Sequence, residues 1–296
     1  MSLLPRNGAA RCPLNLFGAT LRWTEWGPLD GAPVVCVHGL TRTGRDFDAL
    51  AQVLAGQGRR VICPDIFGRG LSDWLPDGHL YAVPTYVAAL LPVLAALGRP
   101  YDWVGTSMGG LIGMMVATVP GNRLRRLVLN DVGPAIPAEA LRHIASYLST
   151  GQDFPDLRAL EAHLRVIHAP FGPLTDTQWE HLARTSARMT ADGRLVLHYD
   201  PAIAEPMRQS PPVDVDLWKF WDAVQQPVLV LRGARSELLQ PDTVARMLER
   251  DGVEAAEVPG CGHAPALMDP GQTALVAEFL GRWLSPQAGL KPEGGR

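Results

Sequence analysis

Six consecutive residues in the first half of the sequence, Gly105-Thr106-Ser107-Met108-Gly109-Gly110, have the types and spacing of a nucleophilic turn. They follow an apolar run that is typical of a strand, and they open a stretch that is typical of a helix. In a Gly-x-Ser-x-Gly corner of this kind, the residues two positions from the serine must be small because the turn is tight. The hydroxyl is then held out from the edge of the sheet. We therefore expect Ser107 to be a nucleophile.

A serine hydroxyl is a weak nucleophile until a neighbouring imidazole takes its proton. His263 is the candidate for this base, because Gly260-Cys261-Gly262-His263-Ala264-Pro265 follows the last predicted strand and its glycines allow a loop that reaches the same sheet edge. Most of the other histidines fall on predicted helices or in a region without strands, where packing or surface roles are expected. His143 and His168 are the two that could face a substrate.

An imidazole base needs a carboxylate that orients it and stabilises its charged form. Two acidic residues stand at the carboxyl ends of predicted strands. Glu237 lies in Arg232-Gly233-Ala234-Arg235-Ser236-Glu237, and Asp131 follows Leu129-Asn130. Their positions after predicted strands do not decide which of the two residues is the acid.

Acyl transfer also needs amide donors directed at the oxygen that becomes negatively charged. The segment His38-Gly39-Leu40-Thr41 follows a predicted strand, and the backbone N–H of Leu40 could act with that of Met108 as an oxyanion hole. We expect His38 to hold this loop by hydrogen bonds. A serine with an oxyanion hole predicts attack on a carbonyl of an ester, thioester, lactone, amide or activated carbon–carbon bond.

The elements that would position these residues alternate between strands and helices, which predicts an α/β fold with a mostly parallel sheet flanked by helices. The alternation stops at about residue 135 and returns at 227. We therefore expect a core over 14–134 and 227–285, a mainly helical inserted cap over 135–226, and flexible termini over 1–13 and 286–296. The predicted core strands are 33–39, 60–65, 101–105, 124–130, 227–233 and 253–258.

The composition is that of a globular protein, with 296 residues, 47% hydrophobic residues and a net charge of −3. No basic face for nucleic acid is predicted, and no apolar run approaches the roughly 20 residues of a membrane span. The first 13 residues lack the apolar centre of a signal peptide, so a cytoplasmic location is expected. The four cysteines show no paired spacing and no cluster with histidines, so neither a metal nor another cofactor is expected. The oligomeric state stays open.

These motifs together resemble the α/β-hydrolase superfamily over 16–284. The order Ser107, Glu237, His263 follows that of the family, and Asp65-Ile66-Phe67-Gly68-Arg69-Gly70-Leu71-Ser72 is similar to its Asp-x-x-Gly-x-Gly-x-Ser stretch. The resemblance implies a structural turn for Asp65 and Ser72. It also favours Glu237 over Asp131 as the acid, although most relatives have Asp there.

The resemblance implies a carboxylic-ester hydrolase that works through an acyl-enzyme on a small-molecule substrate. The alternatives are a carbon–carbon bond hydrolase of ring-fission products, a thioesterase or a lactonase, and a ligand receptor without catalysis. Few basic residues stand near the site, which favours an uncharged acyl ester of short to medium length. The residues expected to line the substrate pocket are Arg42, His143, Tyr147, Phe171 and Trp218.

Overall fold

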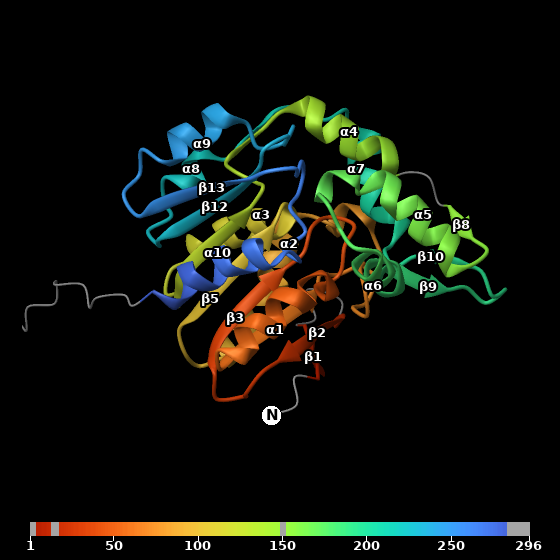
Figure 1. Cartoon of the computed structure of the whole chain (residues 1–296), viewed down its shortest axis with the longest axis horizontal. Coiled ribbons are helices and arrows are strands. Elements are labelled where there is room, and N and C mark those ends of the chain that lie inside the picture. Colours follow the sequence, from red (N-terminus) through yellow and green to blue (C-terminus); the bar gives the residue numbers. More distant parts are fainter. Residues whose placement is uncertain (1–3, 13–17, 149–151, 283–296) are drawn as a thin grey trace, which may run out of the picture.

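The computed structural model describes residues 4–12, 18–148 and 152–282. Its centre is an eight-stranded sheet of order β1-β2-β4-β3-β5-β6-β12-β13, in which the six strands from β4 to β13 run parallel and β1 and β2 are antiparallel to their neighbours. This arrangement confirms the predicted α/β fold (Figure 1). The strands are β1 Arg6–Arg11, β2 Thr20–Trp26, β3 Ala32–Val37, β4 Arg59–Asp65, β5 Tyr101–Thr106, β6 Leu124–Asn130, β12 Val228–Gly233 and β13 Val253–Val258.

Helices cover both faces of the sheet, so its central strands are apolar on both sides. Along β3, Val35 and Val37 pack into one hydrophobic core, whereas Val34 and Cys36 pack into the other. The first core includes residues of α2, α3 and α9, and the second includes residues of α1 and α10. The helices are α1 Asp48–Gly56, α2 Val83–Ala96, α3 Met108–Ala117, α9 Pro241–Met247 and α10 Pro270–Gly281.

The segment between β6 and β12 is mainly helical and has a small apolar core of its own, which includes Leu160, Leu164, Trp179 and Leu182. In Figure 1 the elements from α4 to β10 gather at one end of the sheet, whereas α8 lies beside β12, β13 and α9. The elements are β7 Ala135–Ile136, α4 Ala138–Leu148, β8 Asp153–Phe154, α5 Leu157–Ile167, α6 Asp176–Ser186, β9 Ala187–Met189, β10 Leu195–Leu197, α7 Glu205–Gln209, β11 Val215–Asp216 and α8 Trp218–Trp221.

The N-terminal region differs from the expectation of a flexible terminus over 1–13. Arg6–Arg11 forms strand β1, and its residues pair in antiparallel register with β2, from Arg6 opposite Glu25 to Arg11 opposite Thr20. The partner strand supplies the order here, because this edge strand carries few apolar side chains of its own. The expected flexible tail over 286–296 lies outside the described residues. Among the described residues, none of the helices combines the length and the hydropathy of a membrane-spanning segment.

Candidate active site

Ser107 occupies the sharp corner between β5 and α3, with φ of 52° and ψ of −115°. The close packing of this corner explains the glycines around it. A Cβ on Gly105 would lie 2.3 Å from the carbonyl oxygen of Gly109, and a Cβ on Gly109 would lie 1.9 Å from that of Val37. Only glycine fits at either position, so the Gly-x-Ser-x-Gly spacing follows from the turn that holds Ser107 at the sheet edge.

His263 connects Ser107 to a buried carboxylate. Its Nε2 lies 2.9 Å from Ser107 Oγ, and its Nδ1 lies 2.7 Å from Asp131 Oδ2. Because the carboxylate accepts the Nδ1 proton, the Nε2 lone pair is free to accept the serine proton. The three residues follow β5, β6 and β13, whose carboxyl ends meet at one edge of the sheet. Here the structure brings together three of the predicted site residues.

Asp131 is held in place by bonds from three sides. Its side chain is completely buried, and Oδ1 accepts the backbone N–H of Gly233 at 2.7 Å. Oδ2 accepts the hydroxyl of Ser236 at 2.6 Å in addition to the imidazole of His263. Such bonds stabilise an ionised carboxylate in a buried place. The supporting role of Ser236 was not predicted from the sequence.

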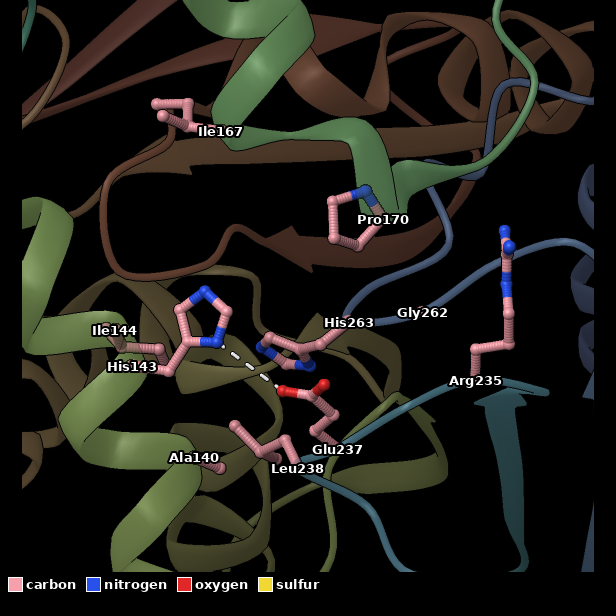
Figure 2. A pocket seen from close by; sticks show the side chains of 10 residues that line it. All are labelled: Ala140, His143, Ile144, Ile167, Pro170, Arg235, Glu237, Leu238, Gly262 and His263. Atoms are coloured by element: carbon pink, nitrogen blue, oxygen red, sulfur yellow. Dashed lines mark ion pairs between the residues drawn. The ribbon is translucent and has the colours of Figure 1, made fainter.

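The structure corrects the preference for Glu237 as the acid. The side chain of Glu237 is 76% exposed, and its carboxylate lies 3.4 Å from Nδ1 of His143 instead of contacting His263 (Figure 2). The loop after β12 turns the side chain of Ser236 inward and that of Glu237 outward, so a carboxylate at 237 points toward α4. The position next to His263 is filled by Asp131, which directly follows β6.

The loop after β3 lies against the serine corner. A Cβ on Gly39 would be 3.8 Å from Cβ of Ser107. Among the described residues, neither the N–H of Leu40 nor that of Met108 donates a hydrogen bond, so both are free to bind a ligand. His38 fixes this loop, because its Nε2 accepts the N–H of Ile66 at 2.9 Å and its Nδ1 donates to the carbonyl of Gly39 at 2.7 Å.

The complete burial of His38 has a measurable consequence for stability. Desolvation lowers the pKa of His38 to about 3, whereas an unfolded histidine has a pKa of about 6.5. Between these values the unfolded chain binds the extra proton, so stability falls as the pH falls below about 6.5. We expect the difference in unfolding free energy between the wild type and His38→Gln to shrink by about 2 kcal/mol from pH 6.5 to pH 4.5.

Urea unfolding of both proteins at several pH values measures this difference. Asp65, whose pKa burial raises to about 6, and His168, whose pKa burial lowers, titrate in both proteins and cancel in the comparison. Parallel stability curves for the two proteins over this pH range would contradict the assignment of a neutral, buried His38.

A cavity of about 120 Å³ lies beside His263, between α4, the end of α5 and the loops after β12 and β13. Figure 2 shows the side chains of His143 and Ile144 approaching it from α4 and that of Leu238 from the loop after β12. The lining is mainly apolar. It consists of Ala140, His143, Ile144, Ile167, Pro170, Arg235, Glu237, Leu238, Gly262 and His263.

The structure separates the expected pocket residues. His143 lines the cavity beside His263, whereas Arg42 is buried in an ion pair with Asp46 at 2.7 Å. Phe171 stacks on His168, with ring centroids 4.4 Å apart, close to Arg42.

Two further residues, Trp218 and Tyr147, were expected in the pocket. Trp218 stands on α8 under the guanidinium of Arg246, 3.7 Å from the ring centroid, and is not among the residues that line the cavity. The side chain of Tyr147 lies outside the described residues.

Asp65 and Ser72 close the turn that follows β4. Asp65 accepts the backbone N–H groups of Gly44 and Leu71, at 2.8 and 2.9 Å. The hydroxyl of Ser72 donates to the carbonyl of Asp65 and accepts the N–H of Arg22. Neither side chain contacts Ser107 or His263 in these bonds. Within the described ranges, no group of three or more His, Cys, Asp or Glu side chains is placed to hold a metal ion.

The model of the alpha/beta hydrolase family matches residues 34–277. The chain is 44% identical over 293 residues to the 3-hydroxybutyrate-oligomer hydrolase of Cupriavidus necator. This match covers 95% of this chain and 99% of the relative.

Two solved structures also match nearly the whole chain. An alpha/beta hydrolase from Novosphingobium aromaticivorans is 36% identical to this chain, with a TM-score of 0.84. The match covers 95% of this chain and 99% of the Novosphingobium chain. A hydrolase from Rickettsia typhi is 30% identical to this chain, with a TM-score of 0.86. The match covers 94% of this chain and 98% of the Rickettsia typhi chain.

Proposed function

The chain belongs to the alpha/beta hydrolase family, and on that premise we propose that it cleaves carboxylic esters through an acyl-enzyme on Ser107. The observation that carries this proposal is the series of hydrogen bonds from Ser107 Oγ through His263 to Asp131. A hydroxyl bonded to a neutral imidazole, which a buried carboxylate orients in turn, is the arrangement that activates serine for attack on a carbonyl.

The proposed reaction has two halves. His263 Nε2 takes the proton of Ser107 as Oγ bonds to the ester carbonyl carbon, and the N–H groups of Leu40 and Met108 stabilise the resulting oxyanion. His263 then gives this proton to the departing alkoxide, and the acyl group remains on Ser107. A water molecule, deprotonated by His263, attacks the acyl-enzyme, and the acid is released as the proton returns to Ser107. Throughout, Asp131 holds the Nδ1 proton and stabilises the imidazolium.

The substrate class that we propose is short oligoesters of 3-hydroxy acids. The relative from Cupriavidus necator is named for this activity and matches nearly the whole chain. The small, mainly apolar cavity beside His263 suits an acyl unit of a few carbons, and the exposed Arg235 at its border could attract a chain that ends in a carboxylate. This class differs from the uncharged ester that the scarcity of basic residues suggested.

A hydrolysis panel tests this proposal. We expect kcat/KM for the dimer and trimer of 3-hydroxybutyrate to exceed that for p-nitrophenyl butyrate, a butyryl thioester, butyramide and a vinylogous diketone. The reason is that the cavity and its border would accommodate both the acyl unit and the terminal carboxylate.

Ser107→Ala is the control for every substrate in the panel. Faster cleavage of the thioester or of the diketone than of the esters would contradict the proposed reaction and indicate a thioesterase or a carbon–carbon bond hydrolase instead. Equal kcat/KM for the oligomers and for simple butyl esters would leave the esterase in place and remove the proposed substrate class.

A further inference from the structure

Arg69 is a completely buried cation in the turn after β4, a stretch from which the sequence predicted only a structural role. Its guanidinium is bound on several sides. Nε donates to the carbonyl of Leu40 at 2.7 Å, and Nη1 donates to the carbonyl of Phe67 and the hydroxyl of Tyr86, each at 2.7 Å. Nη2 lies 3.9 Å from Sδ of Met108. Arg69 therefore contacts both residues whose N–H groups would form the oxyanion hole.

Within the described ranges, no carboxylate lies at ion-pair or hydrogen-bond distance from the Arg69 guanidinium. Its hydrogen-bond partners among the described residues are two carbonyls, one hydroxyl and one thioether, and none is a carboxylate. The rings of Tyr81 and Tyr86 lie 5.5 and 5.3 Å from the guanidinium carbon and supply the negative potential of their faces. An unpaired charge at full burial is costly, so it persists where surrounding bonds hold it in place.

The contacts place Arg69 and His38 on two successive peptide groups of the same loop. His38 Nδ1 holds the carbonyl of Gly39, which belongs to the peptide group that carries the N–H of Leu40. Arg69 Nε holds the next carbonyl, that of Leu40 itself. With both carbonyls fixed, the peptide between Gly39 and Leu40 cannot rotate, so its N–H keeps one direction.

We propose that Arg69 is the positioning residue of the oxyanion hole: it fixes the loop that carries the Leu40 amide and the side chain of Met108, and its unpaired charge stabilises the oxyanion. This inference rests on the proposed function of Ser107 and its two amide donors. A preorganised positive charge in a water-excluded place stabilises a developing anion more than the same charge in solvent. The stabilisation is therefore expected in the transition state and not in substrate binding.

The variants Arg69→Lys and Arg69→Met separate charge from geometry. Removing one oxyanion donor outright costs about 10²–10³-fold in kcat, so losing its support in Arg69→Met is expected to lower kcat by about 10–100-fold, with KM changed by less than about 3-fold. Arg69→Lys keeps the positive charge but loses the planar, forked set of guanidinium N–H donors. Its kcat is therefore expected to lie between those of the wild type and Arg69→Met.

Arg126→Met is the matched control. Arg126 is also buried and also donates to backbone carbonyls, those of Leu280 and Arg282, but it stands at the start of β6, at the opposite end of that strand from Asp131. Its loss is expected to lower the melting temperature without changing kcat. Circular dichroism and the melting temperature show which variants are folded at the assay temperature.

The inhibition constant of an alkyl boronic acid, which forms a tetrahedral anion on serine, is the readout that a merely structural role would not move. Across the Arg69 variants we expect its logarithm to rise in proportion to the loss in log kcat/KM. The inference is overturned if folded Arg69→Met keeps kcat within about 3-fold of the wild type, or if Arg126→Met loses as much. Failure of the proposed function would appear differently, as full activity in Ser107→Ala.

Discussion

Replacing Ser107 with alanine is expected to lower kcat for ester hydrolysis by about 10³-fold or more. The serine oxygen is the atom that bonds to the carbonyl carbon, and His263 Nε2 has no other hydroxyl within hydrogen-bond distance among the described residues. The activity that remains would come from the oxyanion donors and substrate binding alone. Steady-state kinetics on the preferred ester measures the loss, and a fluorophosphonate probe is expected to label Ser107 in the wild type.

Ser210→Ala, which removes an exposed serine from the inserted segment, is the matched control and should keep both activity and labelling. A folded Ser107→Ala protein with near-normal kcat would contradict the assignment. So would a peptide map of the wild type that places the phosphonate on another serine.

Asp131→Asn is expected to lower kcat by about 10²–10⁴-fold, whereas Glu237→Gln is expected to stay within about 3-fold of the wild type. An amide at 131 removes the negative charge and can present an N–H to His263 Nδ1, which favours the wrong tautomer of the imidazole. The side chain of Glu237 is exposed and its carboxylate pairs with His143, so its charge contributes little. Steady-state kinetics of the two isosteric variants makes the comparison.

The melting temperatures of the two variants show whether a lower kcat results from unfolding of the variant. This control matters because Asp131 also binds the N–H of Gly233 and the hydroxyl of Ser236. A large loss in Glu237→Gln together with a small one in Asp131→Asn would restore the acid that the family pattern favours.

The parts of the site that the sequence predicted well are those governed by local sterics. The corner at Ser107 needs glycine at 105 and 109 because carbonyl oxygens stand where their Cβ atoms would be. Because this requirement involves only five consecutive residues, it can be recognised in the sequence. The alternation of apolar strands and helices likewise predicted the parallel sheet, because each central strand is buried on both faces.

The choice of acid was beyond a local pattern. Asp131 and Glu237 both follow core strands, and what separates them is the direction that the loop after β12 takes, which turns Ser236 toward the carboxylate and Glu237 toward α4. A serine directly before Glu237 was a possible signal. It gains meaning only when Asp131 is known to lie within hydrogen-bond distance of its hydroxyl.

The substrate pocket was the least predictable part. Aromatic residues of the inserted segment were all candidates for its wall, and their positions depend on how the segment folds on the core. Trp218 packs under Arg246 of α9, and Phe171 stacks on His168. Strand β1 is a comparable case, since its order comes from pairing with β2 and not from an apolar pattern of its own.

An acyl-enzyme on Ser107 can be trapped and located directly. Wild-type protein mixed with p-nitrophenyl butyrate and quenched in acid within the first turnover can be digested and mapped by mass spectrometry. We expect a butyryl group on the peptide that contains Ser107, formed at the rate of the p-nitrophenol burst and absent in Ser107→Ala. Burst kinetics with the acyl group on a different residue, or steady turnover in Ser107→Ala, would contradict it.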